Sequence, residues 1–112
     1  MAIRIIVSNL VGFKVKGSIN DASGIAQPFD FGLTCVRLSL DEIQSKLRED
    51  GESATVTDFM VSIVRDWSGV KEEDGQTVPY SEGALRALCN ISGIAMLVYR
   101  AYMNEVGAKE KN

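Results

Sequence analysis

Histidine is absent from this chain of 112 residues, and cysteine occurs only twice. Without histidine there is no Ser-His or Cys-His nucleophile pair, and the commonest general base of enzymes is missing. Cys35 and Cys89 lie far apart in the sequence, which matches no zinc-binding spacing. We therefore expect no metal centre and no catalytic centre of these kinds, and we interpret both cysteines as reduced, buried thiols.

Clusters of basic residues are also missing, and the formal net charge is −3. Lys14 and Lys16 alternate along an expected strand, while Lys109 and Lys111 belong to a short C-terminal tail. Binding to a phosphate backbone requires clustered lysine and arginine side chains. Nucleic acid is therefore not an expected partner.

Long hydrophobic runs are absent as well. No apolar stretch approaches the roughly 20 residues that span a bilayer. The N-terminal residues MAIRIIVSNL lack the pattern of a cleaved signal peptide. We expect a cytoplasmic protein that does not enter a membrane.

The familiar motifs of ligand sites do not occur either. The glycines form neither a G-x-G-x-x-G fingerprint nor a Walker loop. The acidic loop around Asp74 fails as an EF-hand, because Val70 and Ser81 stand where the first and last calcium ligands are required. The carboxylate pair Asp41-Glu42 falls in an expected first helical turn, where the helix dipole accounts for it. The sequence therefore predicts no enzyme and no cofactor.

The length of the chain fits one domain, residues 1–112, with a strand-rich part at residues 1–38. Candidate strands occupy residues 3–7, 11–19 and 28–38. The last two alternate apolar and polar residues, which indicates strands with one buried face and one wet face. Pro28 cannot donate a hydrogen bond to a neighbouring strand, so we expect it at a strand start or at a sheet edge.

A helical period replaces this alternation over residues 39–106. Expected helices begin near Ser39, Thr55, Ser81 and Gly93, and residues 107–112 form a flexible tail. The first helix ends at Asp50-Gly51 and has an apolar side of Leu40, Ile43 and Leu47. The second has the clearest apolar stripe: Val56, Phe59, Met60, Ile63, Val64 and Trp67. The predicted fold class is α+β, with a small N-terminal antiparallel sheet of about three strands followed by about four helices.

The stretch DWSGVKEEDGQTVPYSEGAL, residues 66–85, joins the second and third expected helices. We interpret it as a structural linker in which Trp67 is a core residue and Asp74-Gly75 turn the chain. Pro79 and Ser81 then set the start of the third helix, with Ser81 as its N-cap.

The fourth expected helix has apolar residues on two sides. One stripe comprises Ile94, Leu97, Val98 and Ala101, and the other comprises Met96, Tyr99, Met103 and Val106. Two stripes indicate either a helix through the centre of the core or a second face held for a partner. Methionine and tyrosine suit adaptable interfaces, so Met96, Tyr99 and Met103 are the candidate partner-binding residues.

The order of signals from residue 66 onward resembles that of the tail assembly chaperones of long-tailed bacteriophages and their prophages. The matching elements are DWSGV, the acidic turn EEDG with QTVPYS, the helix EGALRALC, and a last helix with AYM before a lysine-containing tail. The preceding helices match in length and order, and the strand-rich part matches in general character.

This resemblance implies a non-enzymatic cytoplasmic protein that binds the tape measure protein, assists polymerisation of the tail tube and is absent from the mature virion. It also implies contact with the major tail tube protein, directly or through a longer frameshifted form, and self-association into a ring is an option. Two alternatives stay open: a structural tail component that oligomerises, and a host adaptor domain. A second candidate contact is the exposed edge of the sheet, which can accept a strand from a partner.

Overall fold

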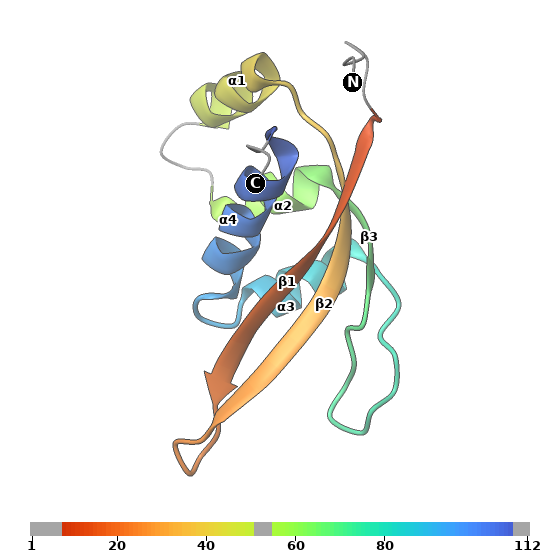
Figure 1. Ribbon diagram of the computed structural model, residues 1–112, viewed down its shortest axis with the longest axis vertical. Coiled ribbons are helices and arrows are strands. Elements are labelled where there is room, and N and C mark those ends of the chain that lie inside the picture. The colour runs from red at the N-terminus through yellow and green to blue at the C-terminus, as the bar shows by residue number, and fades with distance from the viewer. Residues whose placement is uncertain (1–7, 51–54, 109–112) are drawn as a thin grey trace.

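The computed structural model describes residues 8–50 and 55–108, and its fold is α+β, as the sequence predicts. A three-stranded antiparallel sheet with the order β1-β2-β3 packs against four helices (Figure 1). In chain order the elements are β1 (Leu10–Asn20), β2 (Ala26–Val36), α1 (Leu40–Asp50), α2 (Val56–Ile63), β3 (Val64–Ser68), α3 (Glu82–Cys89) and α4 (Ile94–Val106). The strand predicted at residues 3–7 and the end of the predicted tail, residues 109–112, lie outside the described residues.

β1 and β2 form a long hairpin whose alternation places one face in the core. Its buried side chains are Val11, Phe13, Val15, Phe31, Leu33 and Cys35. The hairpin extends beyond the helices (Figure 1), so Ile19 is 43% exposed although the alternation of the strand would place it on the buried face. The Asp21 carboxylate closes the turn by accepting hydrogen bonds from the backbone N–H groups of Ser23 and Ile25.

Pro28 lies opposite Ser18 in β2, which is the central strand. The Arg37 N–H donates to the Asn9 carbonyl and the Asp21 N–H to the Ile25 carbonyl, and both pairs follow the hairpin register. Hydrogen-bonded and non-hydrogen-bonded pairs alternate in an antiparallel ladder. The pair Ser18–Pro28 is therefore a non-hydrogen-bonded pair, and the backbone nitrogen of Pro28 faces away from β1. Because β3 pairs with β2 only from Gly32 onward, the proline removes no bond between strands.

The third strand corrects the prediction, because Val64–Ser68 is a strand and not the end of the second helix. α2 ends at Ile63, so Trp67 lies on β3, beside Leu33 of β2. Val64 and Trp67 are three residues apart and would face opposite sides of a regular strand. A bulge between β2 and β3 places both in the core, with Arg65 as the extra residue. The spacing that resembled a helical stripe is therefore the spacing across a bulge.

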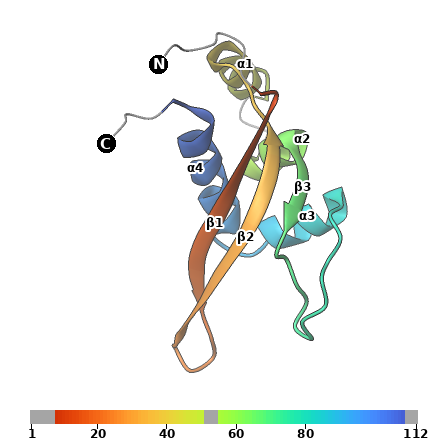
Figure 2. The ribbon, with the colours of Figure 1, turned by 45° about the vertical axis from the view of Figure 1, so that its right-hand side comes forward.

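The helices cover one face of the sheet, and the core lies between the two layers (Figure 2). α4 runs along β1, while α2 and α3 lie behind the rest of the sheet. One core cluster includes buried residues of the sheet, of the turn before α1 and of all four helices. The prediction of one buried face and one wet face is confirmed by the burial along β1, where every buried residue alternates with an exposed one from Leu10 to Lys16.

The apolar side predicted for α1 is only partly buried. Ile43 is buried, but Leu40 is 71% exposed and Leu47 is 49% exposed. α1 lies beyond the end of the sheet (Figure 1), so only its inner side meets the core. The helix starts where predicted, at Ser39, with a capping box: the Ser39 hydroxyl accepts from the Glu42 N–H and the Glu42 carboxylate accepts from the Ser39 N–H.

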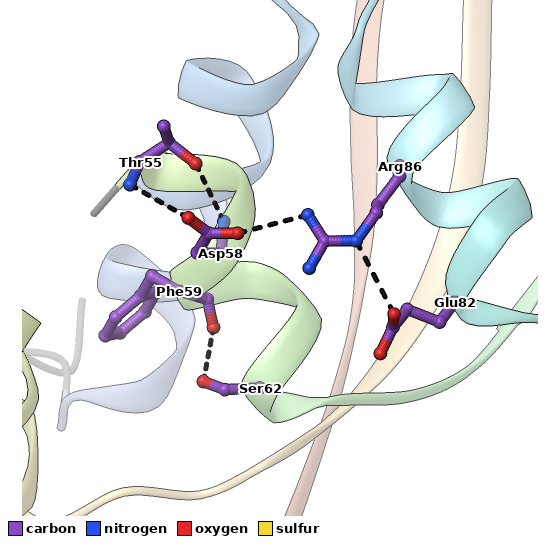
Figure 3. Close-up of polar contacts among 6 residues, drawn as sticks. All are labelled: Thr55, Asp58, Phe59, Ser62, Glu82 and Arg86. Carbon is purple, nitrogen blue, oxygen red and sulfur yellow. Dashed lines mark hydrogen bonds and ion pairs between the residues drawn. The ribbon is translucent and has the colours of Figure 1, made fainter. Parts of the chain in front are cut away.

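The N-terminus of α2 is joined to α3 through one carboxylate (Figure 3). Asp58 and Thr55 form a capping box at the predicted helix start, each side chain accepting from the backbone N–H of the other. Asp58 Oδ1 also accepts from Arg86 Nη1 at 3.0 Å, and Arg86 Nε lies 3.5 Å from Glu82 Oε2. The hydrogen bond from Arg86 and those from Thr55 hold the pKa of Asp58 below its ordinary value of 3.8.

Replacing Arg86 with glutamine is expected to raise the pKa of Asp58, because the hydrogen bond from the Arg86 guanidinium is the largest cause of the lowered pKa. A carboxylate with a lowered pKa stabilises the fold above its unfolded pKa, and that contribution is lost as the pH falls through the folded pKa. The variant should therefore show a weaker loss of stability on acidification. Carboxyl chemical shifts of Asp58 measure the pKa, and Lys46→Gln on α1 is the control. An unchanged Asp58 pKa would contradict the link between the helices.

Candidate partner-binding surface

The inner face of α4 fixes the helix in the core. Ile94, Val98 and Tyr102 are buried at a spacing of four residues. The Tyr102 hydroxyl donates to the Val36 carbonyl at 2.8 Å and accepts from the Leu38 N–H at 3.1 Å. The sequence interpretation placed Ala101 on this stripe and missed Tyr102, although its spacing from Ile94 and Val98 is the signal that identifies it.

A second side of α4, next to the buried face, carries the three candidate residues Met96, Tyr99 and Met103, which we call the α4 flank. Met96 is 40% exposed. Tyr99 and Met103 are partly buried against the core, and the Tyr99 ring packs edge-on to Phe59 with a centroid distance of 5.6 Å. The structure therefore brings the three side chains to one side of the helix, with one methionine open to solvent and two supporting residues set into the domain.

A small apolar pocket of about 180 Å³ lies between the base of the hairpin and the junction of α3 and α4. Phe29 and Phe31 of β2 line it together with Leu88 of α3. Ile19 and Ile91, both more than two-fifths exposed, stand among its lining residues. Sequence reasoning did not find this pocket, because it combines residues of β1, β2, the segment after β3 and the α3–α4 region, which show no common motif.

The linker residues form a second hairpin-like segment after β3. The Trp67 Nε1–H donates to the Val78 carbonyl at 2.8 Å, and the Tyr80 hydroxyl donates to the Val64 carbonyl at 3.1 Å. The Trp67 and Tyr80 rings meet edge-to-face at a centroid distance of 5.3 Å. The returning segment is thereby held against β3, with Pro79 exposed between two partly buried residues.

The acidic turn of the linker uses its own polar groups. Asp74 Oδ1 accepts from the Gln76 N–H, and the Gly75 N–H donates to the Glu72 carbonyl. Gly75 has φ +87, a left-handed conformation that glycine adopts at no steric cost. Beyond the turn, Ser81 caps α3 by accepting from the Ala84 N–H at 3.1 Å. The positions of Asp74, Gly75 and Ser81 thus agree with a structural linker.

The two cysteine thiols lie in the interior. Burial raises the pKa of the Cys35 thiol to about 12, and burial also raises the pKa of Cys89 above its ordinary value. A thiol with a raised pKa is a poor nucleophile, because the reactive form is the thiolate. Over residues 8–50 and 55–108, no group of three or more histidine, cysteine, aspartate or glutamate side chains is placed to hold a metal ion.

The chain matches no known family model, no curated protein and no solved structure. Within the described part of the chain, no helix has the length and apolar character needed to cross a bilayer. The α4 flank combines one exposed apolar side chain, Met96, with two that are packed against the core, Tyr99 and Met103, and it is the surface that we consider for binding a partner.

Proposed function

We propose that this protein is a non-enzymatic tail assembly chaperone of a long-tailed bacteriophage or prophage. In this proposal it binds the tape measure protein in the host cytoplasm, assists polymerisation of the tail tube around it, and is absent from the mature virion. The major tail tube protein is the second partner, reached directly or through a longer frameshifted form. The order of sequence signals from residue 66 onward supports the proposal.

The α4 flank is the observation that carries the proposal. A long helical protein with extended apolar stripes would aggregate in water, so its chaperone needs a surface that covers those stripes and then releases them. Met96 offers an exposed, flexible thioether, and Tyr99 and Met103 form an apolar base beside it. A surface of this size gives reversible contact, since one exposed anchor residue contributes far less than a fully buried interface core.

Replacing Met96 with glutamate is expected to weaken capture of the tape measure protein about tenfold, because a charge would enter an apolar contact. The probe is the long helical protein expected to be encoded directly downstream, co-expressed with the tagged chaperone and quantified by pull-down. Met103→Glu is avoided, because Met103 packs against the core and its replacement would also affect folding.

Leu40→Glu is the matched control for this experiment. It introduces the same charge at an exposed apolar residue of α1. Leu40 lines a surface pocket together with Val106, at the C-terminal end of α4, whereas Met96 is near the other end of that helix. Circular dichroism of both variants checks that the fold is intact. Undiminished capture by Met96→Glu would remove the α4 flank from the interface, and stoichiometric presence of the protein in purified particles would favour a structural tail component instead.

A further inference from the structure

The outer edge of β1 has no strand partner among the residues that the structure describes. β1 is at the end of the strand order β1-β2-β3, so no described strand pairs with its second side. Asn9 and Asp21, at the two ends of β1, both form backbone hydrogen bonds to the facing strand. Because such pairs alternate, the N–H and C=O groups of the odd-numbered residues of β1 point toward β2. The N–H and C=O groups of Gly12, Lys14, Lys16 and Ser18 therefore point outward, and all four residues are exposed.

This edge is built for continuous pairing. β1 contains no proline, and its pairing with β2 runs from Leu10 to Asn20 without a register shift. Strand addition is a common mode of peptide recognition because main-chain hydrogen bonds supply affinity while alternate side chains supply specificity. The outward groups from Gly12 to Ser18 thus offer a regular row of donors and acceptors.

The charges along β1 select what can pair there. Lys14 lies opposite Gly32, which has no side chain, and Lys16 lies opposite Asp30. Within the described part of the chain neither lysine forms an ion pair. Like charges directly opposite one another destabilise a strand pair and opposite charges stabilise it. Two copies of β1 would bring their lysines together, so self-pairing is disfavoured and an acidic strand is favoured.

The other face of an added strand would meet α4. Figures 1 and 2 both show α4 alongside β1. The Leu97 side chain packs against the sheet at Gly17. A methyl group added to Gly17 would lie only 2.9 Å from Cδ2 of Leu97, so the two residues are in close contact. Ala101 follows Leu97 by one helical turn, and both are only partly buried. An apolar side chain on the inner face of an added strand would therefore have an apolar surface to cover.

We propose that the β1 edge accepts an extended segment of a partner protein in which acidic residues alternate with apolar ones. The acidic side chains lie opposite Lys14 and Lys16, and the apolar side chains cover Leu97 and Ala101. This site is separate from the α4 flank and does not depend on the chaperone proposal.

Amide hydrogen exchange tests the proposal at individual residues, with an end-blocked peptide of alternating valine and glutamate as the probe. In the free protein the amides of Val11, Phe13 and Val15 are protected by β2, and those of Gly12, Lys14, Lys16 and Ser18 exchange fast. Addition of the peptide at low salt is expected to slow exchange at this second set. Absence of binding, or binding without that protection, would overturn the proposal.

Charge reversal tests the chemistry of the partner. The double variant Lys14→Glu/Lys16→Glu is expected to bind the glutamate peptide about tenfold more weakly and to prefer a valine–lysine peptide instead. Lys46→Glu/Lys71→Glu changes the net charge equally at positions outside β1 and should retain the original preference. Equal binding of both peptides by the unmodified protein would overturn the assignment of an acidic partner.

Discussion

Replacing Tyr102 with alanine is expected to destabilise the protein by about 3–5 kcal/mol, the range found for removal of a large buried aromatic side chain. Tyr102 is fully buried, and its ring lies 6.3 Å from that of Phe13 and 6.1 Å from that of Phe59. The alanine variant loses these contacts together with the hydroxyl bonds to the strand end at Val36 and Leu38. Urea unfolding followed by circular dichroism measures the change.

Tyr102→Phe separates packing from hydrogen bonding. It retains the ring but leaves the Leu38 N–H without its hydroxyl acceptor, for an expected cost of about 1–3 kcal/mol. A phenylalanine variant as stable as the unmodified protein would contradict the role assigned to the hydroxyl. An alanine variant with a loss under about 1 kcal/mol would contradict the central position of the ring.

Alkaline pH gives an independent measurement on the same residue. Burial raises the pKa of Tyr102 above its ordinary value of 10.0, so the folded protein favours the protonated hydroxyl. The resulting stabilisation is complete below pH 10.0 and is lost as the pH rises through the folded pKa. Tyr102→Phe should therefore lose less stability above that pH than the unmodified protein does.

Trp67→Ala is expected to cost about 3–5 kcal/mol, because it removes the ring that joins β3 to the returning linker. The loss includes the indole bond to Val78 and the edge-to-face contact with Tyr80. Trp67→Phe retains an aromatic ring and loses the indole donor, so it should be destabilised less. Urea unfolding of both variants measures the difference.

A second readout locates the effect of Trp67 in the structure. Hydrogen exchange in Trp67→Ala should accelerate first in the linker, where Val78 donates its N–H to the Val70 carbonyl. The matched position is Phe59, a buried aromatic residue of α2 whose ring packs against Tyr99 and Tyr102 of α4. If Phe59→Ala loosened the linker as much as Trp67→Ala, Trp67 would not be its specific anchor.

The parts of the fold that the sequence predicts well are those with purely local causes. The caps at Ser39, Thr55 and Ser81 depend on residues within one helical turn, and each is present in the structure. The alternation of apolar and polar residues along the two long strands likewise follows from the two-residue period of a strand with one buried face. These features were predictable because no distant segment could change them.

The parts that were missed depend on distant contacts. The spacing of Val64 and Trp67 fits both a helix and a bulged strand, and only pairing with β2 decides between them. The outer residues of α1 stay exposed because the sheet ends before it, which no local pattern reveals. For the α4 flank, the sequence identified Met96, Tyr99 and Met103 as one face, but the partial burial of Tyr99 depends on its contact with Phe59 on another helix.

The two sides of the sheet differ in their capacity for growth. On the β3 side the strand is short and bulged, and the outward N–H of Trp67 is already bound by the carboxylate of Asp66 at 2.8 Å. A fibril requires every subunit to offer two compatible borders, one for the subunit above and one for the subunit below. Over residues 8–50 and 55–108 the sheet offers one such border, at β1, so a strand that joins it ends the stack instead of propagating it.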